Sequence, residues 1–164
     1  MLLPIIIEPN DALHLKSETI DRADLNTPHL QKLIANMAET MYTKDGIGLA
    51  APQIGQTIRL IVISKEFNPL NKKKELVLIN PQWEKTSIFK NWDEEGCLSV
   101  PFVYGQVKRY RKIKVKALNE NGKKLNFSAE DYYARVIQHE VDHLDGIIFT
   151  SKAKNLREIR NEQI

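Results

Sequence analysis

A single predicted helix limits the fold of this chain more than any other part of its sequence. The helix begins after Ser128, whose hydroxyl suits an N-cap with Asp131 three residues further on, and it ends before Gly146. Residues at helical spacing form one mostly apolar face: Tyr133, Val136, Ile137, Glu140, Val141 and Leu144. A helix with such a face is stable only when it is buried, so the rest of the chain must pack around it.

Two histidines lie inside this helix, in the run His139-Glu140-Val141-Asp142-His143. Residues four apart lie one above the other on a helix, so both imidazoles project to one side and can bind one metal ion. Glu140 can then act as general base on a water held by that metal. A glutamate between two buried histidines is costly without a cation to neutralise it, and the pattern therefore indicates a metal site.

A catalytic metal site also needs a third protein ligand and an open position. In zinc proteases with a similar helix, the third ligand follows that helix in the sequence. In this chain no histidine follows His143, and Glu158 is a downstream carboxylate that could take this role. Upstream lies Cys97, and a thiolate bound to a divalent cation forms a strong bond. We predict Cys97, His139 and His143 as the ligands. A zinc protease that uses Glu158 and a closed structural zinc site with a fourth protein ligand remain alternatives.

The remaining sequence predicts a helix near the N-terminus followed by short strands. Thr27 suits an N-cap, Pro28 suits the first helical position, and the helix should end near Asp45-Gly46. Its apolar face is formed by Leu30, Leu33, Ile34, Met37 and Met41. Runs typical of strands are 58–63, 76–79, 103–107 and 113–117, with a hairpin turn at 119–122. We therefore predict an α+β fold: antiparallel β-sheets packed around a central metal-binding helix, with an N-terminal helix and a short C-terminal helical tail.

Length and composition exclude several classes of protein. The 164 residues fit one catalytic domain, 1–164, and the net charge of +3 is too small to indicate a dedicated nucleic-acid-binding protein, so we expect no DNA partner. The single cysteine excludes an intrachain disulfide and favours a reducing compartment. The apolar run 1–7 is too short for a membrane span and Glu8 follows it at once, so we expect no membrane partner.

Three motifs stand out along the chain: 46–53 (Gly-Ile-Gly-Leu-Ala-Ala-Pro-Gln), 95–99 (Glu-Gly-Cys-Leu-Ser) and 138–143 (Gln-His-Glu-Val-Asp-His). In this order and at these spacings, they resemble the peptide deformylase family in its bacterial and organellar form. Asn80-Pro81 and the stretch 109–122 match less strongly, so the resemblance covers most of the chain. It implies a metal-dependent amidohydrolase that removes the formyl group from the N-terminal formyl-methionine of newly made polypeptides.

The resemblance also implies roles for single residues. Cys97, His139 and His143 would bind one divalent metal with a position left for water; ligand softness alone favours zinc, whereas the family implies Fe(II), with Ni(II), Zn(II) or Co(II) as substitutes. Glu140 would take a proton from the metal-held water and return it to the departing amine. Gln53, through its side-chain amide, and Leu98, through its backbone N–H, would stabilise the oxyanion.

The substrate would lie beside the first motif, because Gly46 and Gly48 leave room for an extended peptide against the main chain. Ile47, Tyr132 and Val136 would line the slot for the methionine side chain, although all three are equally suited to the hydrophobic core. We also expect an ion pair between Arg109 and Asp142 behind the metal ligands.

The resemblance implies that the partners are formyl-methionyl nascent peptides and, in a transient contact, the ribosome. We also expect the protein to be a monomer and to be located in the bacterial cytoplasm. The chain departs from the family pattern at His14, which follows Asp11-Ala12-Leu13, and at Tyr110 after Arg109. Its tail is short, so we do not expect the long C-terminal helix that some members use on the ribosome. These departures concern substrate approach and partners and leave the metal ligands unchanged.

Overall fold

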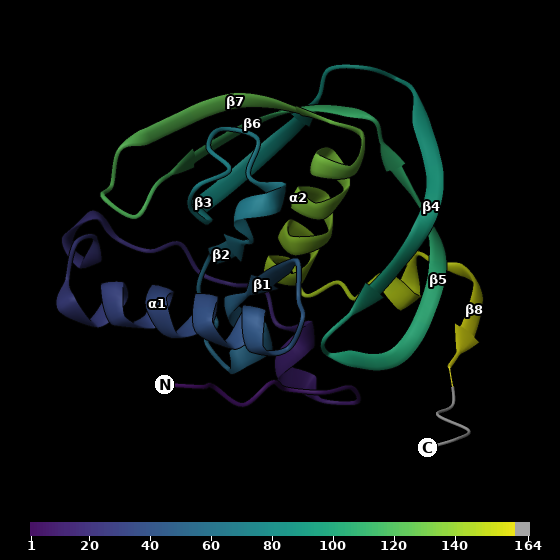
Figure 1. Ribbon diagram of the computed structural model, residues 1–164, viewed down its shortest axis with the longest axis horizontal. Helices are drawn as coiled ribbons and strands as arrows, with labels where there is room; N and C mark the ends of the chain where they lie inside the picture. The colour runs from purple at the N-terminus through teal and green to yellow at the C-terminus, as the bar shows by residue number, and fades with distance from the viewer. Residues whose placement is uncertain (160–164) are drawn as a thin grey trace.

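The computed structural model describes residues 1–159, which form two antiparallel β-sheets around a buried helix. The five-stranded sheet has the order β1 (Gly48–Ala50), β2 (Leu60–Ile63), β3 (Leu76–Lys85), β6 (Lys112–Leu118), β7 (Lys124–Glu130). The three-stranded sheet has the order β4 (Lys90–Cys97), β5 (Val100–Tyr110), β8 (Lys154–Glu158). The helices are α1 (Pro28–Thr43) and α2 (Asp131–Leu144). As Figure 1 shows, α2 lies between the two sheets, which confirms the predicted α+β architecture.

The N-terminal helix α1 has the predicted start. Thr27 is the N-cap, its hydroxyl accepts a hydrogen bond from the Leu30 N–H at 3.3 Å, and Pro28 occupies the first helical turn. The side chains that α1 buries include Leu30, Ile34, Met37 and Met41. They pack against the face of the five-stranded sheet that carries Leu60 and Val62, in one of the hydrophobic clusters of the core.

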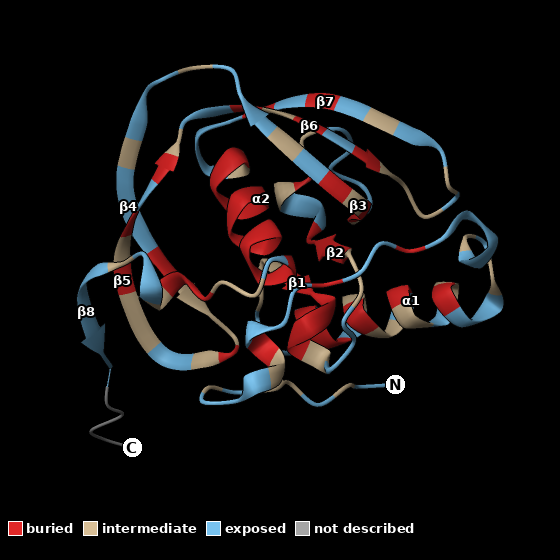
Figure 2. Cartoon of the chain, turned by 180° about the vertical axis from the view of Figure 1, so that it is seen from behind, coloured by how far each residue is buried: buried red, intermediate tan, exposed pale blue. Residues whose placement is uncertain are grey.

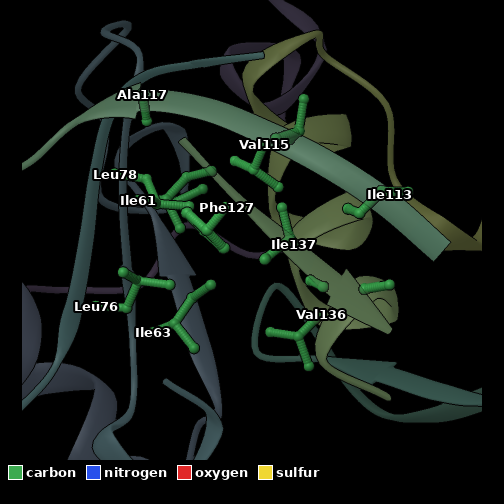
Figure 3. Close-up of a cluster of buried hydrophobic side chains, with 14 of the residues drawn as sticks. Ile61, Ile63, Leu76, Leu78, Ile113, Val115, Ala117, Phe127, Val136 and Ile137 are labelled. Carbon is green, nitrogen blue, oxygen red and sulfur yellow. The ribbon is translucent and has the colours of Figure 1, made fainter. Parts of the chain in front are cut away.

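The other face of the five-stranded sheet packs against α2. Figure 3 shows Ile61, Ile63, Leu76 and Leu78 from β2 and β3, with Val115 and Phe127 from β6 and β7, turned toward Val136 and Ile137 of α2. Every residue of α2 from Ala134 to Leu144 is buried, as Figure 2 shows. Packing of its apolar side chains holds α2 in the core. The polar side chains of the same helix are therefore buried as well.

The predicted start of α2 is wrong by two residues. Ser128 is not its N-cap: β7 continues through Glu130, which is the N-cap without a side-chain hydrogen bond, and Asp131 turns the chain with φ 50°. Ser128 pairs with Lys114 of β6, and Ala129 with Ile113. Pairing with β6 and burial of Ala129 thus prevail over the local capping pattern. The predicted end is confirmed, since Gly146 follows the helix with φ 73°.

The predicted C-terminal helical tail is also wrong. Residues 154–158 form strand β8, which pairs with β5 at Val103, Tyr104 and Gln106. The pairing satisfies backbone groups along an edge of β5 that would otherwise be open. The short helical turn Phe149–Ser151 precedes it, and the part of the predicted tail after Ile159 lies outside the described residues.

Strand β4 has no counterpart in the predicted set of strands. Its sequence, Lys-Asn-Trp-Asp-Glu-Glu-Gly-Cys, is mostly polar, and only pairing with β5 from Lys90 to Cys97 makes it a strand.

Short turns at Asp11–His14, Arg22–Asp24, Ala51–Ile54 and Lys65–Phe67 connect the remaining elements. Among the described residues no helix is long and apolar enough to cross a membrane.

Candidate metal centre

The side chains of Cys97, His139 and His143 meet between the two sheets. One potential ligand atom from each lies within 4.8 Å of the others. Cys97 Sγ is 3.3 Å from Nε2 of His143, and the two imidazole centroids are 5.1 Å apart. Both histidines are buried on α2, whereas Cys97 is the last residue of β4. A thiolate and two imidazoles at this spacing can bind one divalent cation and leave a position open.

The alternative ligands do not join this group. Glu158 is exposed on β8, where the register places it opposite Val103. Nε2 of His14 lies 2.7 Å from Oε1 of Glu8, and His29 is exposed near the start of α1. The described residues therefore offer neither the carboxylate of a zinc protease nor the fourth ligand of a closed structural zinc site.

Glu95 connects this centre to a buried network of charges. Its carboxylate accepts a hydrogen bond from Nδ1 of His139 at 2.7 Å, two from Arg109 at 2.8 and 2.9 Å, and one from Arg135 at 2.7 Å. Burial acts to raise the pKa of Glu95, but the hydrogen bonds from Arg109 and His139 hold that pKa well below its usual value. The ionised carboxylate orients the His139 ring so that Nε2 is free for a metal.

The expected ion pair between Arg109 and Asp142 is confirmed. Nη1 of Arg109 donates to Oδ2 of Asp142 at 2.7 Å, and Lys152 donates to the same carboxylate at 2.9 Å. Sequence reasoning missed the roles of Glu95 and Arg135. Their signals were local: Glu95 stands two residues before Cys97, and Arg135 stands one helical turn before His139.

The titration of the two histidines reflects their surroundings. Burial acts to lower the pKa of His139, but the neighbouring Cys97 and Glu95 raise it to about 10. Burial and the charge of His139 together hold the pKa of His143 well below its usual value. A buried site that favours one positive charge this strongly is electrostatically suited to a metal cation.

Glu140 occupies the position expected of a general base. It is buried, and burial raises the pKa of its carboxyl to about 7, against the lowering effect of His139. Within residues 1–159 its Oε2 has no hydrogen-bond partner. A carboxylate with a pKa near neutrality can both accept and return a proton at physiological pH.

Gln53 lies against the same centre. Its side-chain Nε2 donates to Ser99 Oγ at 3.2 Å and to Cys97 Sγ at 3.4 Å, while its Oε1 accepts from the Ala50 N–H at 2.9 Å. The backbone N–H of Ser99 also donates to Cys97 Sγ, at 3.4 Å. These two hydrogen bonds hold the Gln53 amide and the Ser99 main chain against the sulfur of Cys97.

The predicted substrate residues are two glycines and three larger side chains, which differ in their surroundings. Gly46 lies so close to Leu98 that a Cβ atom at position 46 would be 2.9 Å from Leu98 Cδ1. Gly48 lies so close to Glu140 that a Cβ atom at position 48 would be 2.3 Å from Glu140 Oε1. Ile47 and Val136 both pack in the core cluster beside α2. Tyr132 is 39% exposed and contacts Phe67 with 5.3 Å between ring centroids. Only the two glycines are thus in contact with residues of the proposed centre, and the roles of all five toward a substrate stay predictions.

Comparison with known proteins adds independent information. A family model described as polypeptide deformylase matches residues 2–158. A peptide deformylase of Symbiobacterium thermophilum is 42% identical over 98% of this chain and 71% of that protein. One of Desulfotalea psychrophila is 42% identical over 95% of this chain and 90% of that protein.

Solved structures resemble the fold over nearly its whole length. A ligand-bound class I type b peptide deformylase of Acinetobacter baumannii matches with a TM-score of 0.86 and 36% identity, over 93% of this chain and 99% of that chain. The peptide deformylase of Thermotoga maritima matches with a TM-score of 0.85 and 33% identity, over 94% of this chain and 99% of that chain.

Proposed function

The chain belongs to the polypeptide deformylase family, and from this premise we propose which of its residues carry the reaction. The protein is a metal-dependent hydrolase that removes the formyl group from N-terminal formyl-methionine of nascent polypeptides. Cys97, His139 and His143 are the proposed metal ligands. The observation that carries this assignment is the convergence of one thiol and two imidazoles within 4.8 Å, beside a buried glutamate.

The donor set fits a single divalent cation. One thiolate and two imidazoles suit zinc and the neighbouring transition metals, and a buried Glu140 with an unpartnered oxygen within residues 1–159 is costly unless a cation offsets its charge. We propose Fe(II) as the native ion, with Ni(II), Zn(II) or Co(II) as substitutes. When bound, the cation supplies a Lewis acid that acidifies a water molecule and polarises a carbonyl oxygen.

Glu140 is the proposed proton carrier of the reaction. Its carboxylate accepts a proton from the attacking water, whose oxygen forms a bond to the formyl carbon. When the carbon–nitrogen bond breaks, the same carboxyl returns the proton to the departing nitrogen, and the products are formate and a free amino group. No covalent intermediate with the protein is required, because Cys97 serves as a metal ligand and not as a nucleophile.

Gln53 and Leu98 are the proposed donors to the oxyanion. The Gln53 amide already points its N–H bonds at Cys97 and Ser99, next to the metal ligands, and Leu98 follows Cys97 in the turn between β4 and β5. Donors that are held in place before the reaction stabilise the developing negative charge at no cost of reorganisation. The hydrogen bond from Ala50 to Oε1 of Gln53 fixes which side of the amide donates.

Substrate binding is proposed along residues 46–48. The side-chain directions of Gly46 and Gly48 are filled by Leu98 and Glu140, so the proposed peptide lies along the main chain of this segment rather than in the space left by the missing side chains. Ile47, Tyr132 and Val136 are the proposed lining of a slot for the flexible methionine side chain. Because formylated nascent chains occur in the bacterial cytoplasm, we propose that the protein is located there and contacts the ribosome transiently. A monomer is proposed because all three metal ligands come from one chain.

The test is an anaerobic assay of formate release from a formyl-Met tripeptide, with protein loaded with iron, nickel or zinc. Formate should appear from the formyl peptide and not from the matching acetyl-Met peptide. Cys97→Ala should abolish metal binding and turnover, whereas Glu158→Gln should preserve both. Loss of the metal in Glu158→Gln, or its retention in Cys97→Ala, would overturn the proposed ligand set.

A further inference from the structure

The metal ligands come from two separate parts of the fold. Cys97 ends β4 in the three-stranded sheet, whereas His139 and His143 belong to α2, which packs in the core of the five-stranded sheet (Figure 1). The spacing of the two imidazoles follows from helix geometry alone. The distance from Cys97 to either imidazole depends instead on how the β4–β5 hairpin sits on α2.

One side chain of α2 binds both strands of that hairpin. Nη1 of Arg135 donates to Oε2 of Glu95 at 2.7 Å and to the carbonyl oxygen of Val107 at 2.8 Å. Nη2 donates to the backbone oxygen of Asn91 at 2.9 Å and to its Oδ1 at 3.1 Å. The guanidinium is thus hydrogen-bonded to β4 at two residues and to β5 at a third, from a helix position one turn before His139.

The contact between Arg135 and Glu95 is buried and joins two full charges. The two side chains are 3% and 5% exposed, so water does not compete for this hydrogen bond. Other side chains of α2 also bind the hairpin: His139 binds Glu95 on β4, whereas Gln138 and Asp142 bind Tyr110 and Arg109 on β5. Of these contacts, only those of Arg135 reach both strands.

We propose that Arg135 is a positioning residue that holds the β4–β5 hairpin on α2 at the spacing at which Cys97 and the two histidines bind one metal ion. The inference rests on the proposed ligand set. When the Arg135 contacts are lost, the two histidines keep their helical spacing, while Cys97 is no longer held in register with them. Sulfur ligation should then weaken more than ligation by the imidazoles.

The substitution Arg135→Lys tests this with a small change. Lysine keeps the positive charge and its long side chain, but a single ammonium cannot donate to Asn91, Glu95 and Val107 in the same geometry as a planar guanidinium. The matched control is Arg157→Lys. Arg157 also forms a bidentate pair with a β4 glutamate, Glu94, at 2.7 and 2.9 Å, but this pair is exposed and joins β8 to β4 without involving α2.

The proteins are loaded with Co(II), and the near-ultraviolet thiolate-to-cobalt charge-transfer band and the release of Co(II) to a chelator are measured. Arg135→Lys should weaken the band and release the metal about 10 to 100 times faster than the wild type. Arg157→Lys should match the wild type in both measurements. Retention of the wild-type band and release rate by Arg135→Lys would overturn the proposal.

Two further outcomes are distinct. A wild-type protein that shows no thiolate–cobalt band refutes the ligand set itself, and with it the proposed function. If Arg135→Lys and Arg135→Gln are both unfolded without metal, as judged by circular dichroism and urea titration, then Arg135 is required for folding and the positioning role is rejected. Folded variants with faster cobalt release support it.

Discussion

A Cβ atom on Gly48 would lie 2.3 Å from Oε1 of Glu140. The backbone of β1 and the proposed general base are therefore in direct contact, and no residue other than glycine fits at position 48 without moving the carboxylate. The φ angle of Gly48 is not positive, so the requirement comes from close approach and not from backbone conformation.

Gly48→Ala should reduce kcat by about 100-fold, because a displacement of about 1 Å at a reacting group has a cost of that size. The metal content should stay at the wild-type level, since the atoms nearest to the added methyl group all belong to Glu140 and not to a metal ligand. Steady-state deformylation and elemental analysis of the same preparation measure both quantities. A variant with the wild-type kcat would show that the carboxylate position does not matter.

Glu140→Ala should retain the metal and lose turnover by about 10²- to 10⁴-fold, which is the usual contribution of a positioned general base. Glu130→Ala is the control, because Glu130 is an exposed carboxylate at the start of the same helix. Formate release is measured at equal metal content. Comparable rates for the two variants would remove Glu140 from the mechanism.

Gln53→Ala should lower kcat by about 10²- to 10³-fold if its amide stabilises the oxyanion. Its hydrogen bond to Cys97 Sγ, at 3.4 Å, is made by a neutral donor to a weak acceptor, so metal affinity should change less than kcat. Gln56→Ala, at an exposed position three residues further along, is the matched control and should leave kcat unchanged. A fall confined to metal affinity would indicate that Gln53 only supports the thiolate.

The raised pKa of Glu140 makes a prediction for the metal-free protein. Burial raises this pKa from 4.5 to about 7, so the native state binds the proton more tightly than the unfolded state. The stabilising contribution is complete below pH 4.5 and is lost as the pH rises through 7. Glu140→Gln does not titrate, and it should become more stable than the wild type by on the order of 3 kcal/mol above pH 8.

Urea unfolding of the metal-free wild type and Glu140→Gln at pH 5 and pH 8.5 measures this difference. The stability gap between the two proteins should widen with pH in favour of Glu140→Gln. A gap that is the same at both pH values would mean that the Glu140 carboxyl titrates in the native state as it does in the unfolded chain.

Local patterns predicted the parts of the fold that depend on neighbours in the sequence. Thr27 and Pro28 start α1 as expected, because capping involves atoms within one turn. The two histidines of α2 face the same side because residues four apart do so in any helix. Ser128 was misread as a cap, since the competing β-pairing with Lys114 lies outside any local window.

The amino-acid pattern alone sets the spacing of His139 and His143, the burial of their helix and the presence of a single thiol able to complete the ligand set. That Cys97 reaches the histidines, and that Glu95 is held between Arg109 and Arg135, follows from the packing of distant segments. The same packing makes the polar segment 90–97 a strand. The two cases differ because helical periodicity is a property of consecutive residues, whereas strand pairing and buried ion pairs exist only once distant segments have packed together.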